Sequence, residues 1–269
     1  MAHHHHHHHQ EVTEKTLGQQ NKEHFDKVGA DVFTIPWIVE MSNHIAIELH
    51  DNAEWLGFKR STIDQSSRPT RMLDYACGNG LASRAQVPVT NSPKALAPFV
   101  DSIRGMDISS GMAEQYNKKA QEEGHSPEQK RAIAGDLLHP DATPSPEINT
   151  PEFSGFDVIA MCMALHHVED HTVMIQKLSE RLCEGGVLVI VDWVTPAESG
   201  CPLADKAQEM SNHTITRLGF TEKDVKDDYE KAGLEGWGWK WTSSRCKMPE
   251  EIGGEQQLFI ARGQKPSTA

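Results

Sequence analysis

The segment Leu73-Asp-Tyr-Ala-Cys-Gly-Asn-Gly80 carries the strongest local structural signal in this chain. Residues 71–76 have the pattern of a short strand, the two glycines then make a tight turn, and residues 81–85 are expected to begin a helix. Glycines at a strand-to-helix turn let the backbone approach a ligand closely. By itself the pair Gly78 and Gly80 is weak evidence for a ligand site, because two glycines at such a place more often form a turn without a ligand.

Outward from this turn, apolar runs alternate with helical patterns, which is typical of a parallel sheet covered by helices on both faces. Strands are predicted at 103–108, 131–137, 156–161, 187–193 and 257–261, and helices at 95–101, 109–123 and 168–183. The strict alternation of Trp237, Trp239 and Trp241 predicts one more strand. We therefore predict a doubly wound α/β fold with a mostly parallel sheet and an antiparallel edge hairpin.

The chain before and around this sheet divides into three parts. Residues 1–20 are predicted to be a tag and a disordered N-terminus, because seven histidines at positions 3–9 mark an expression tag that hides the native start. Apolar residues at helical spacing between Phe25 and Phe58 predict a helical segment at 21–60. Residues 61–269 form the main domain, with a mostly helical insertion at about 195–233 that contains a capping box from Thr221 to Asp224.

Composition excludes several function classes. The 26 Lys and Arg against 39 Asp and Glu give a net charge of −13, which argues against nucleic acid or an anionic membrane surface as a partner. No apolar stretch has the length of a membrane span. The five cysteines are widely spaced and none lies in a C-x-x-C pair, so we expect reduced thiols in a cytoplasmic protein and no metal site.

Three acids make the glycine turn more specific evidence for a cofactor site. Asp74, Asp107 and Asp136 each end one of three predicted strands, and ligands of doubly wound folds bind outside these carboxyl ends. Each acid alone would be interpreted as a helix cap. Together they indicate a cofactor with hydroxyl and amino donors and a positive charge. They would repel a pyrophosphate, and Ser83 stands where a dinucleotide fingerprint has glycine or alanine, which disfavours a nicotinamide-dependent dehydrogenase.

With these motifs the sequence resembles class I S-adenosylmethionine-dependent methyltransferases of the UbiE-like, methyltransferase type 11 group. The resemblance covers roughly residues 72–191 and rests on the glycine turn, Gly105-Met-Asp107-Ile-Ser-Ser-Gly-Met112, Gly135-Asp136-Leu137, Phe156-Asp-Val-Ile-Ala-Met-Cys-Met-Ala-Leu-His-His167 and Cys183-Glu-Gly-Gly-Val-Leu188. It implies a Rossmann-like, seven-stranded sheet with a helical lid formed by residues 21–60.

The resemblance also implies S-adenosylmethionine as cofactor and S-adenosylhomocysteine as product. Asp107 would take the ribose hydroxyls, Asp136 the adenine amino group, and Asp74 would lie near the amino group of the methionine part. The cofactor-binding residues implied are Asp74, Ala76, Gly78, Gly80, Asp107, Ile108, Met112, Gly135, Asp136, Leu137, Cys162, Met163 and Ala164. The sequence departs from the family at Ala76, where glycine is more common, and at 86–94, which has the pattern of an inserted surface loop.

Candidates for catalysis and acceptor binding follow the fourth strand and lie in the lid. His166 and His167 would orient or deprotonate the acceptor, with Asp192 as a second candidate base or orienter. Their alternative roles are hydrogen bonds to the backbone and a helix cap. The substrate candidates are Phe25, Phe33, Trp37, Met210 and His213, which could instead be only the core of the lid.

The resulting hypothesis is an enzyme that methylates a small molecule, acting as a monomer or homodimer. A general resemblance to fungal secondary-metabolite thiol S-methyltransferases, of the kind that caps the dithiol of gliotoxin, suggests a thiol acceptor. The alternatives are an O-, N- or C-methyltransferase of a quinone or another metabolite, or a cofactor-binding regulatory protein without methyl transfer.

Overall fold

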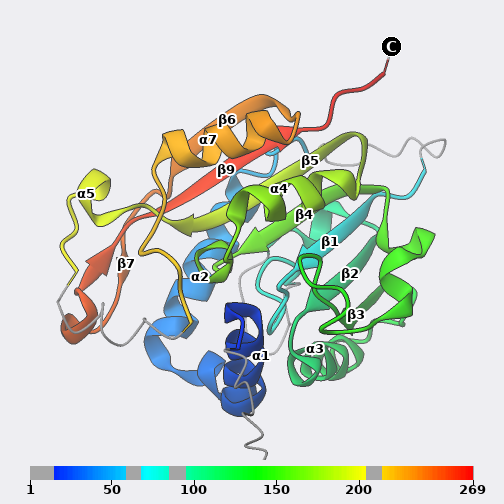
Figure 1. Ribbon diagram of the computed structural model, residues 1–269, viewed down its shortest axis with the longest axis horizontal. Coiled ribbons are helices and arrows are strands. Elements are labelled where there is room, and N and C mark those ends of the chain that lie inside the picture. The colour runs from blue at the N-terminus through cyan, green and yellow to red at the C-terminus, as the bar shows by residue number, and fades with distance from the viewer. Residues whose placement is uncertain (1–14, 59–67, 85–94, 204–213, 269) are drawn as a thin grey trace, which may run out of the picture.

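The computed structural model describes residues 15–58, 68–84, 95–203 and 214–268. Its centre is a seven-stranded sheet in the order β3-β2-β1-β4-β5-β9-β6 (Figure 1). Its strands are β1 (Arg71–Tyr75), β2 (Ser102–Asp107), β3 (Lys130–Ala134), β4 (Phe156–Cys162), β5 (Leu182–Trp193), β6 (Glu235–Trp241) and β9 (Leu258–Gln264). The first five are mutually parallel, and β9 runs antiparallel between β5 and β6. The predicted fold class, including the antiparallel edge hairpin, is confirmed.

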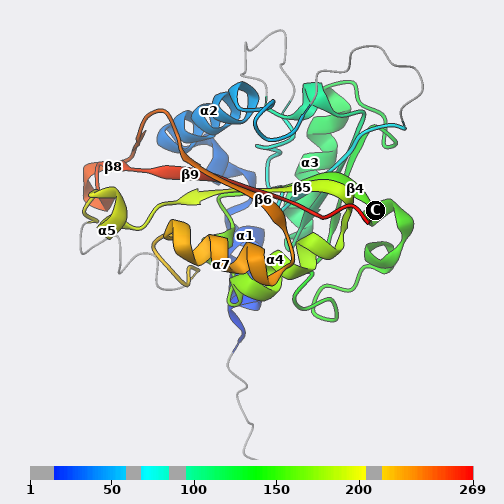
Figure 2. The ribbon, with the colours of Figure 1, turned by 90° about the horizontal axis from the view of Figure 1, so that it is seen from above.

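Helices cover both faces of this sheet. Figure 2 shows α2 (Pro36–Asp51) and α3 (Ser110–Glu122) on one side, and α4 (His171–Glu180) and α7 (Glu222–Lys231) on the other. Alternate strand residues serve the two sides, because successive side chains of a strand point to opposite faces. Buried side chains of α2 pack with Met72, Val158 and Val189. Those of α4 and α7 pack with their neighbours Leu73, Ile159 and Leu188.

The N-terminal segment folds back over the carboxyl ends of the strands. Helix α1 (Leu17–Val28) begins at a capping box between Thr16 and Gln19, inside the tail that the sequence predicts to be disordered. The 3₁₀ helix η1 (Gly29–Thr34) joins it to α2, which starts at Pro36 as proline at a first helical turn allows. The predicted helical segment at 21–60 is therefore two helices, with the first one starting earlier.

The predicted helices on either side of the 86–94 insertion are wrong in the described part of the chain. Residues 81–84 form turns, and only a single 3₁₀ turn, η2 (Ala97–Phe99), follows. The backbone N–H of Leu96 bonds to the carbonyl of Ala82, and that of Ala95 bonds to the carbonyl of Arg84. These bonds between the two segments take the place of helical bonds, and Pro98 has no N–H to continue a helix. The insertion lies outside the described residues.

The predicted helical insertion at 195–233 is described only at residues 195–203 and 214–233. It contains α5 (Pro196–Ser199) and α7, whose capping box from Thr221 to Asp224 is confirmed. In the described residues 214–220, which are not helical, Thr216 donates its backbone N–H to the carbonyl of His166, so these residues lie beside the end of β4. Met210 and His213 lie outside the described residues.

Shorter elements complete the chain. Strand β5 starts at Leu182, five residues before its predicted start, and α4 is correspondingly shorter than its prediction. The loop between β6 and β9 holds a small two-stranded sheet. The remaining elements are β7 (Cys246–Lys247), β8 (Glu255–Gln256), η3 (Pro146–Asn149), η4 (Pro151–Phe153), η5 (Leu165–His167) and η6 (Glu250–Ile252). Within the described ranges, no helix combines the length and apolar character needed to span a bilayer.

The contact between β9 and α7 predicts a stability effect. A Cβ on Gly263 would meet the ring of the buried Tyr229 and lie 3.2 Å from Cβ of Leu234. Gly263→Ala should therefore lower the free energy of unfolding by about 1–3 kcal/mol, measured by urea denaturation. Gly111→Ala is the matched control, because its nearest atom is 3.7 Å away and the change should be neutral or slightly stabilising. Equal stability of the two variants would contradict this packing.

Candidate active site

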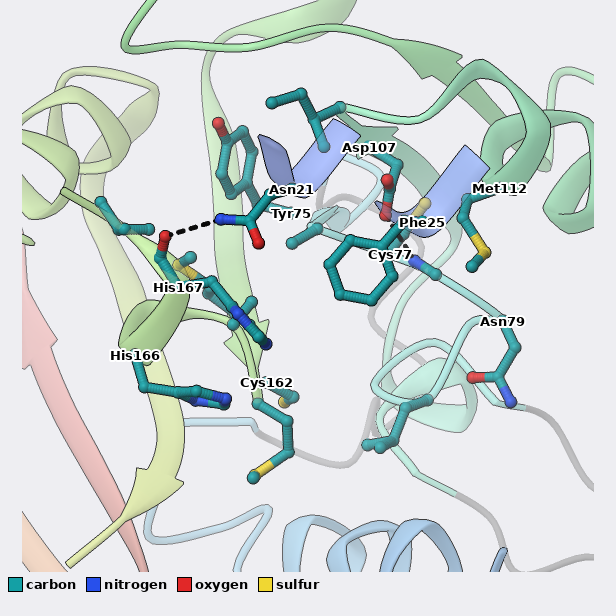
Figure 3. A pocket seen from close by; sticks show the side chains of 18 of the residues that line it. Asn21, Phe25, Tyr75, Cys77, Asn79, Asp107, Met112, Cys162, His166 and His167 are labelled. Carbon is teal, nitrogen blue, oxygen red and sulfur yellow. Dashed lines mark hydrogen bonds between the residues drawn. The ribbon is translucent and has the colours of Figure 1, made fainter. Parts of the chain in front are cut away.

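A cavity of about 300 Å³ opens at the carboxyl ends of β1, β2 and β4, under α1 and η1. Figure 3 shows Asp107 and Met112 on one side of it and His166 and His167 on the other. The predicted residues that line it are Phe25, Phe33, Trp37, Ala76, Gly78, Asp107, Ile108, Met112, Asp136, Cys162, Met163, Ala164, His166 and His167. The structure therefore brings both halves of the predicted site, and the predicted lid aromatics, into one space.

The glycine turn and the end of β2 are held together by Asp107. Its Oδ2 accepts the backbone N–H of Gly78 at 2.9 Å, and its Oδ1 accepts that of Ser109, also at 2.9 Å. Each carboxylate oxygen keeps a further lone pair, because a carboxylate accepts about four hydrogen bonds. Burial raises the pKa of Asp107 to about 6. The carboxylate is thus ionised at neutral pH and able to accept two more donors from the cavity.

Backbone strain is concentrated at the same edge of the sheet. Ala76 and Met163, which follow the adjacent strands β1 and β4, both have a positive φ, of 54° and 56°. This left-handed conformation costs a residue with a Cβ about 1–2 kcal/mol. The predicted departure at Ala76 is therefore a real strain. Gly78 also has a positive φ, of 44°, and the ring of Phe33 lies over it, where a Cβ would come within 2.9 Å of Phe33 Cζ.

Asp74 lies behind the turn and does not line the cavity. Burial raises its pKa to about 7, and the nearby Ser83 and Lys130 oppose this shift. Its Oδ2 is buried with no hydrogen-bond partner. The other predicted cofactor residues outside the lining are Gly80, Gly135 and Leu137. For the two glycines the structure gives a packing reason, because a Cβ would come within 3.2 Å of Tyr116 at Gly80 and 2.7 Å of Ile148 at Gly135.

Asp136 lies at the far end of the cavity, next to the N-terminal helix. Its Oδ1 accepts the backbone N–H of Leu138 at 2.9 Å. Gly18 of α1 lies over its Oδ2 and over Ile108, so close that a Cβ on Gly18 would be 3.7 Å and 3.8 Å from them. Helix α1 therefore covers this end of the cavity with its backbone and no side chain.

His166 is oriented by a buried carboxylate. Its Nδ1 lies 2.7 Å from Oδ1 of Asp192, and its backbone N–H donates to Oδ2 of the same residue. Asp192 is fully buried at the end of β5 and also accepts the N–H of Trp193. Because a carboxylate only accepts, Nδ1 of His166 carries the hydrogen and Nε2 is left to face other groups.

His167 faces a backbone carbonyl, whereas His166 faces a carboxylate. Its Nδ1 lies 2.5 Å from the carbonyl oxygen of Thr214, so Nδ1 carries a hydrogen and Nε2 has a free lone pair. Burial, together with the adjacent His166, lowers the pKa of His167 to about 3, and the ring stays neutral. The ring of Phe25 meets it edge-on at a centroid distance of 5.5 Å.

Several lining residues were not predicted from the sequence. The most informative is Asn21, whose Nδ2 donates to the carbonyl of His167 at 3.1 Å. No apolar periodicity marks it, because it is a polar residue in a mostly polar helix. The others include Gly18, Ile38, Met41, Ser42 and Trp193.

Comparisons with known proteins agree with this geometry. A family described as "methyltransferase domain" matches residues 48–237. An uncharacterized methyltransferase of Schizosaccharomyces pombe is 30% identical over 165 residues, which cover 61% of this chain and 52% of that protein. A mitochondrial ubiquinone biosynthesis O-methyltransferase of Candida albicans is 24% identical over 195 residues, which cover 64% of this chain and 54% of that protein. The chain spans about half the length of these curated relatives.

Among solved structures, a phosphoethanolamine N-methyltransferase of Haemonchus contortus has the same fold. It was solved with phosphomonomethylethanolamine and S-adenosylhomocysteine, and it superposes with a TM-score of 0.62 at 13% identity. The match covers 94% of this chain and 61% of that one. The family match spans more than half of the chain and includes the glycine turn, Asp107 and the two histidines, so the chain belongs to the methyltransferase domain family.

Proposed function

We propose that this protein transfers a methyl group from S-adenosylmethionine to a small molecule. The observation that carries the proposal is the arrangement of the cavity, with Gly78 and Asp107 on one side and His166 on the other. A binding module without chemistry would need only the first side.

The residues of the cavity fit such a cofactor. Asp107 has lone pairs on both oxygens for two adjacent ribose hydroxyls, and Asp136 has a free oxygen for an amino group. These carboxylates also suit a ligand with a positive charge. The roles of Asp74, Gly80, Gly135 and Leu137 are indirect in this proposal, because these residues support the turn and the strand ends from behind. When bound, S-adenosylmethionine supplies an electrophilic methyl group.

The protein's own part is to position the acceptor, exclude water and take a proton. Proximity and orientation can supply most of the rate effect in such a displacement. His166 is the candidate base, because Asp192 holds its Nδ1–H and stabilises the imidazolium that forms when Nε2 takes a proton. Asp192 is a positioning residue. His167, with its lowered pKa, is a poor base and acts as a hydrogen-bond acceptor.

Sulfur and oxygen are the acceptor atoms that a specific observation favours, and nitrogen and carbon stay alternatives. Transfer to a thiol is suggested by the resemblance to fungal secondary-metabolite thiol S-methyltransferases and stays a prediction. The cytoplasmic location also stays a prediction. Transfer to a hydroxyl is favoured by the buried Asp192 behind His166, since a hydroxyl needs a base more than a thiol does. The relative in Candida albicans, named as an O-methyltransferase, also favours it. Mass spectrometry of reactions with a panel of thiols, phenols and amines tests the proposal, and no methylated product from any of them would count against it.

Cofactor affinity should depend on Asp107 and on pH. In the free protein its pKa is about 6, and two ribose hydroxyls favour the ionised form. Affinity for S-adenosylhomocysteine should therefore be full above about pH 6 and fall as the pH drops below it. Asp107→Asn should bind about tenfold more weakly at pH 7.5 and lose this pH dependence.

Isothermal titration calorimetry at pH 5 and pH 7.5 measures both effects. Asp51→Asn, at the exposed end of α2, is the control and should behave like the wild type. An unchanged affinity of Asp107→Asn at pH 7.5 would remove Asp107 from the cofactor site.

The pH–rate profile of the histidine variants should identify the acceptor atom. With a hydroxyl acceptor, His166→Ala should lower kcat by about 10²–10⁴-fold, and the loss should persist at pH 9. Asp192→Asn should also lower kcat, because it disturbs the tautomer of His166, whereas His167→Ala should cost less. With a thiol acceptor, turnover should rise toward the thiol pKa and all three variants should recover at high pH. Equal losses for His166→Ala and His167→Ala would contradict the assignment of His166 as the base.

A further inference from the structure

Asn21 presents an unpaired hydrogen-bond acceptor to the cavity. The residue is only 5% exposed, and its Nδ2 donates to the carbonyl of His167. Its Oδ1 is buried and has no hydrogen-bond partner. Figure 3 shows this oxygen pointing into the cavity, between His167 and Phe25. A buried carbonyl oxygen without a partner costs about 1–3 kcal/mol, which a bound donor would recover.

The position of Asn21 favours the acceptor over the cofactor as its partner. The candidate cofactor contacts Gly78 and Asp107 lie at the ends of β1 and β2. Asn21 is instead tied to His167, beyond the end of β4, and His167 stacks against His166 with ring centroids 4.1 Å apart. Its free oxygen is therefore on the side of the candidate base.

The charged groups among the described lining residues are carboxylates. The lining contains the acids Asp107, Asp136 and Glu169, and no lysine or arginine occurs among the described residues of the lining. The histidines add acceptors, since His167 is neutral with a free Nε2. A carboxylate or phosphate on the acceptor would lose its hydration here without gaining a cation, which is strongly unfavourable.

The wall beside His166 is apolar. Trp193 directly follows the carboxylate that holds His166, and it packs in one cluster with Trp37, Ile38, Met41 and Met163. Such a wall favours a flat or branched hydrocarbon skeleton through burial of apolar surface.

We propose, on the basis of the methyl transfer proposed above, that the acceptor is an uncharged, mainly apolar molecule with two hydrogen-bond donors. One is the reacting group, whose proton goes to Nε2 of His166 as its heteroatom bonds to the methyl carbon; the bond from that carbon to the sulfonium sulfur would break with its electron pair left on sulfur, giving S-adenosylhomocysteine. The second donates to Oδ1 of Asn21. Asn21 is thus a residue that determines acceptor specificity, and acceptors with a carboxylate or a phosphate are excluded.

The experiment uses three naphthalenes that differ in one group: 2-naphthol, 2,3-dihydroxynaphthalene and 3-hydroxy-2-naphthoate. Calorimetry at pH 7 measures their binding to the full chain saturated with S-adenosylhomocysteine. The diol should bind about tenfold more tightly than 2-naphthol, and the carboxylate about a hundredfold more weakly than the diol. Asn21→Leu should remove the advantage of the diol and leave the affinity for S-adenosylhomocysteine within about twofold.

Asn21→Asp is the matched control variant. Both substitutions lose the bond from Nδ2 to His167, but only aspartate keeps an oxygen at the position of Oδ1. The advantage of the diol should therefore survive in Asn21→Asp. If the two variants lose it equally, Asn21 only anchors α1 and the inference is wrong.

The remaining outcomes also decide the matter. If the wild type binds S-adenosylhomocysteine but neither uncharged naphthalene, or binds the carboxylate as well as the diol, the acceptor class is wrong while methyl transfer stands. A weaker affinity for S-adenosylhomocysteine in Asn21→Leu but not in Asn21→Asp, which loses the same bond to His167, would assign the free oxygen to the cofactor. Failure of the wild type to bind S-adenosylhomocysteine would overturn the proposed function instead.

Discussion

Both oxygens of Asp107 are held by backbone N–H groups, one from the turn after β1 and one from the cap of α3. These two hydrogen bonds fix the glycine turn, the end of β2 and the start of α3 relative to one another. They also stabilise the ionised carboxylate of Asp107 against burial, which raises its pKa to about 6. Each oxygen keeps a free lone pair for a ligand in the cavity. The strained Ala76 and the close contact of Phe33 with Gly78 belong to the same tight arrangement.

The sheet could be predicted from the sequence because each strand is marked by its own local pattern of apolar residues. Apolar runs such as 156–161 are buried on both faces, and the order of strands and helices then leaves few topologies. The segments at 81–84 and 95–101 were predicted wrongly because their backbone bonds are to each other, as between Leu96 and Ala82, and no local pattern encodes such a pairing. The early start of α1 was missed because a capping box of Thr16 and Gln19 has little weight beside a polar composition.

The candidate site, like the fold, could be predicted from the sequence only in part. The strand-end acids and the pair of histidines were predicted by residue type and position, but their individual states were not. His166 and His167 are adjacent in sequence but have different partners, Asp192 and Thr214, which lie 26 and 47 residues away. Burial lowers the pKa of His167, and a buried carboxylate faces His166; both come from the tertiary structure, so the sequence left the two histidines equivalent. Asn21 carries no sequence signal at all, since its importance comes from burial and from the one atom left without a bond.

Helix α1 touches both halves of the cavity. Asp26 accepts the hydroxyl of Ser109, next to the proposed cofactor side, and Asn21 donates to the carbonyl of His167, on the proposed acceptor side. At its start, the N–H of Leu17 donates to Glu169, which also lines the cavity. One helix therefore contacts both sides of the cavity. By thermodynamic linkage, a ligand on one side that stabilises this position of α1 would tighten binding on the other side by the same factor.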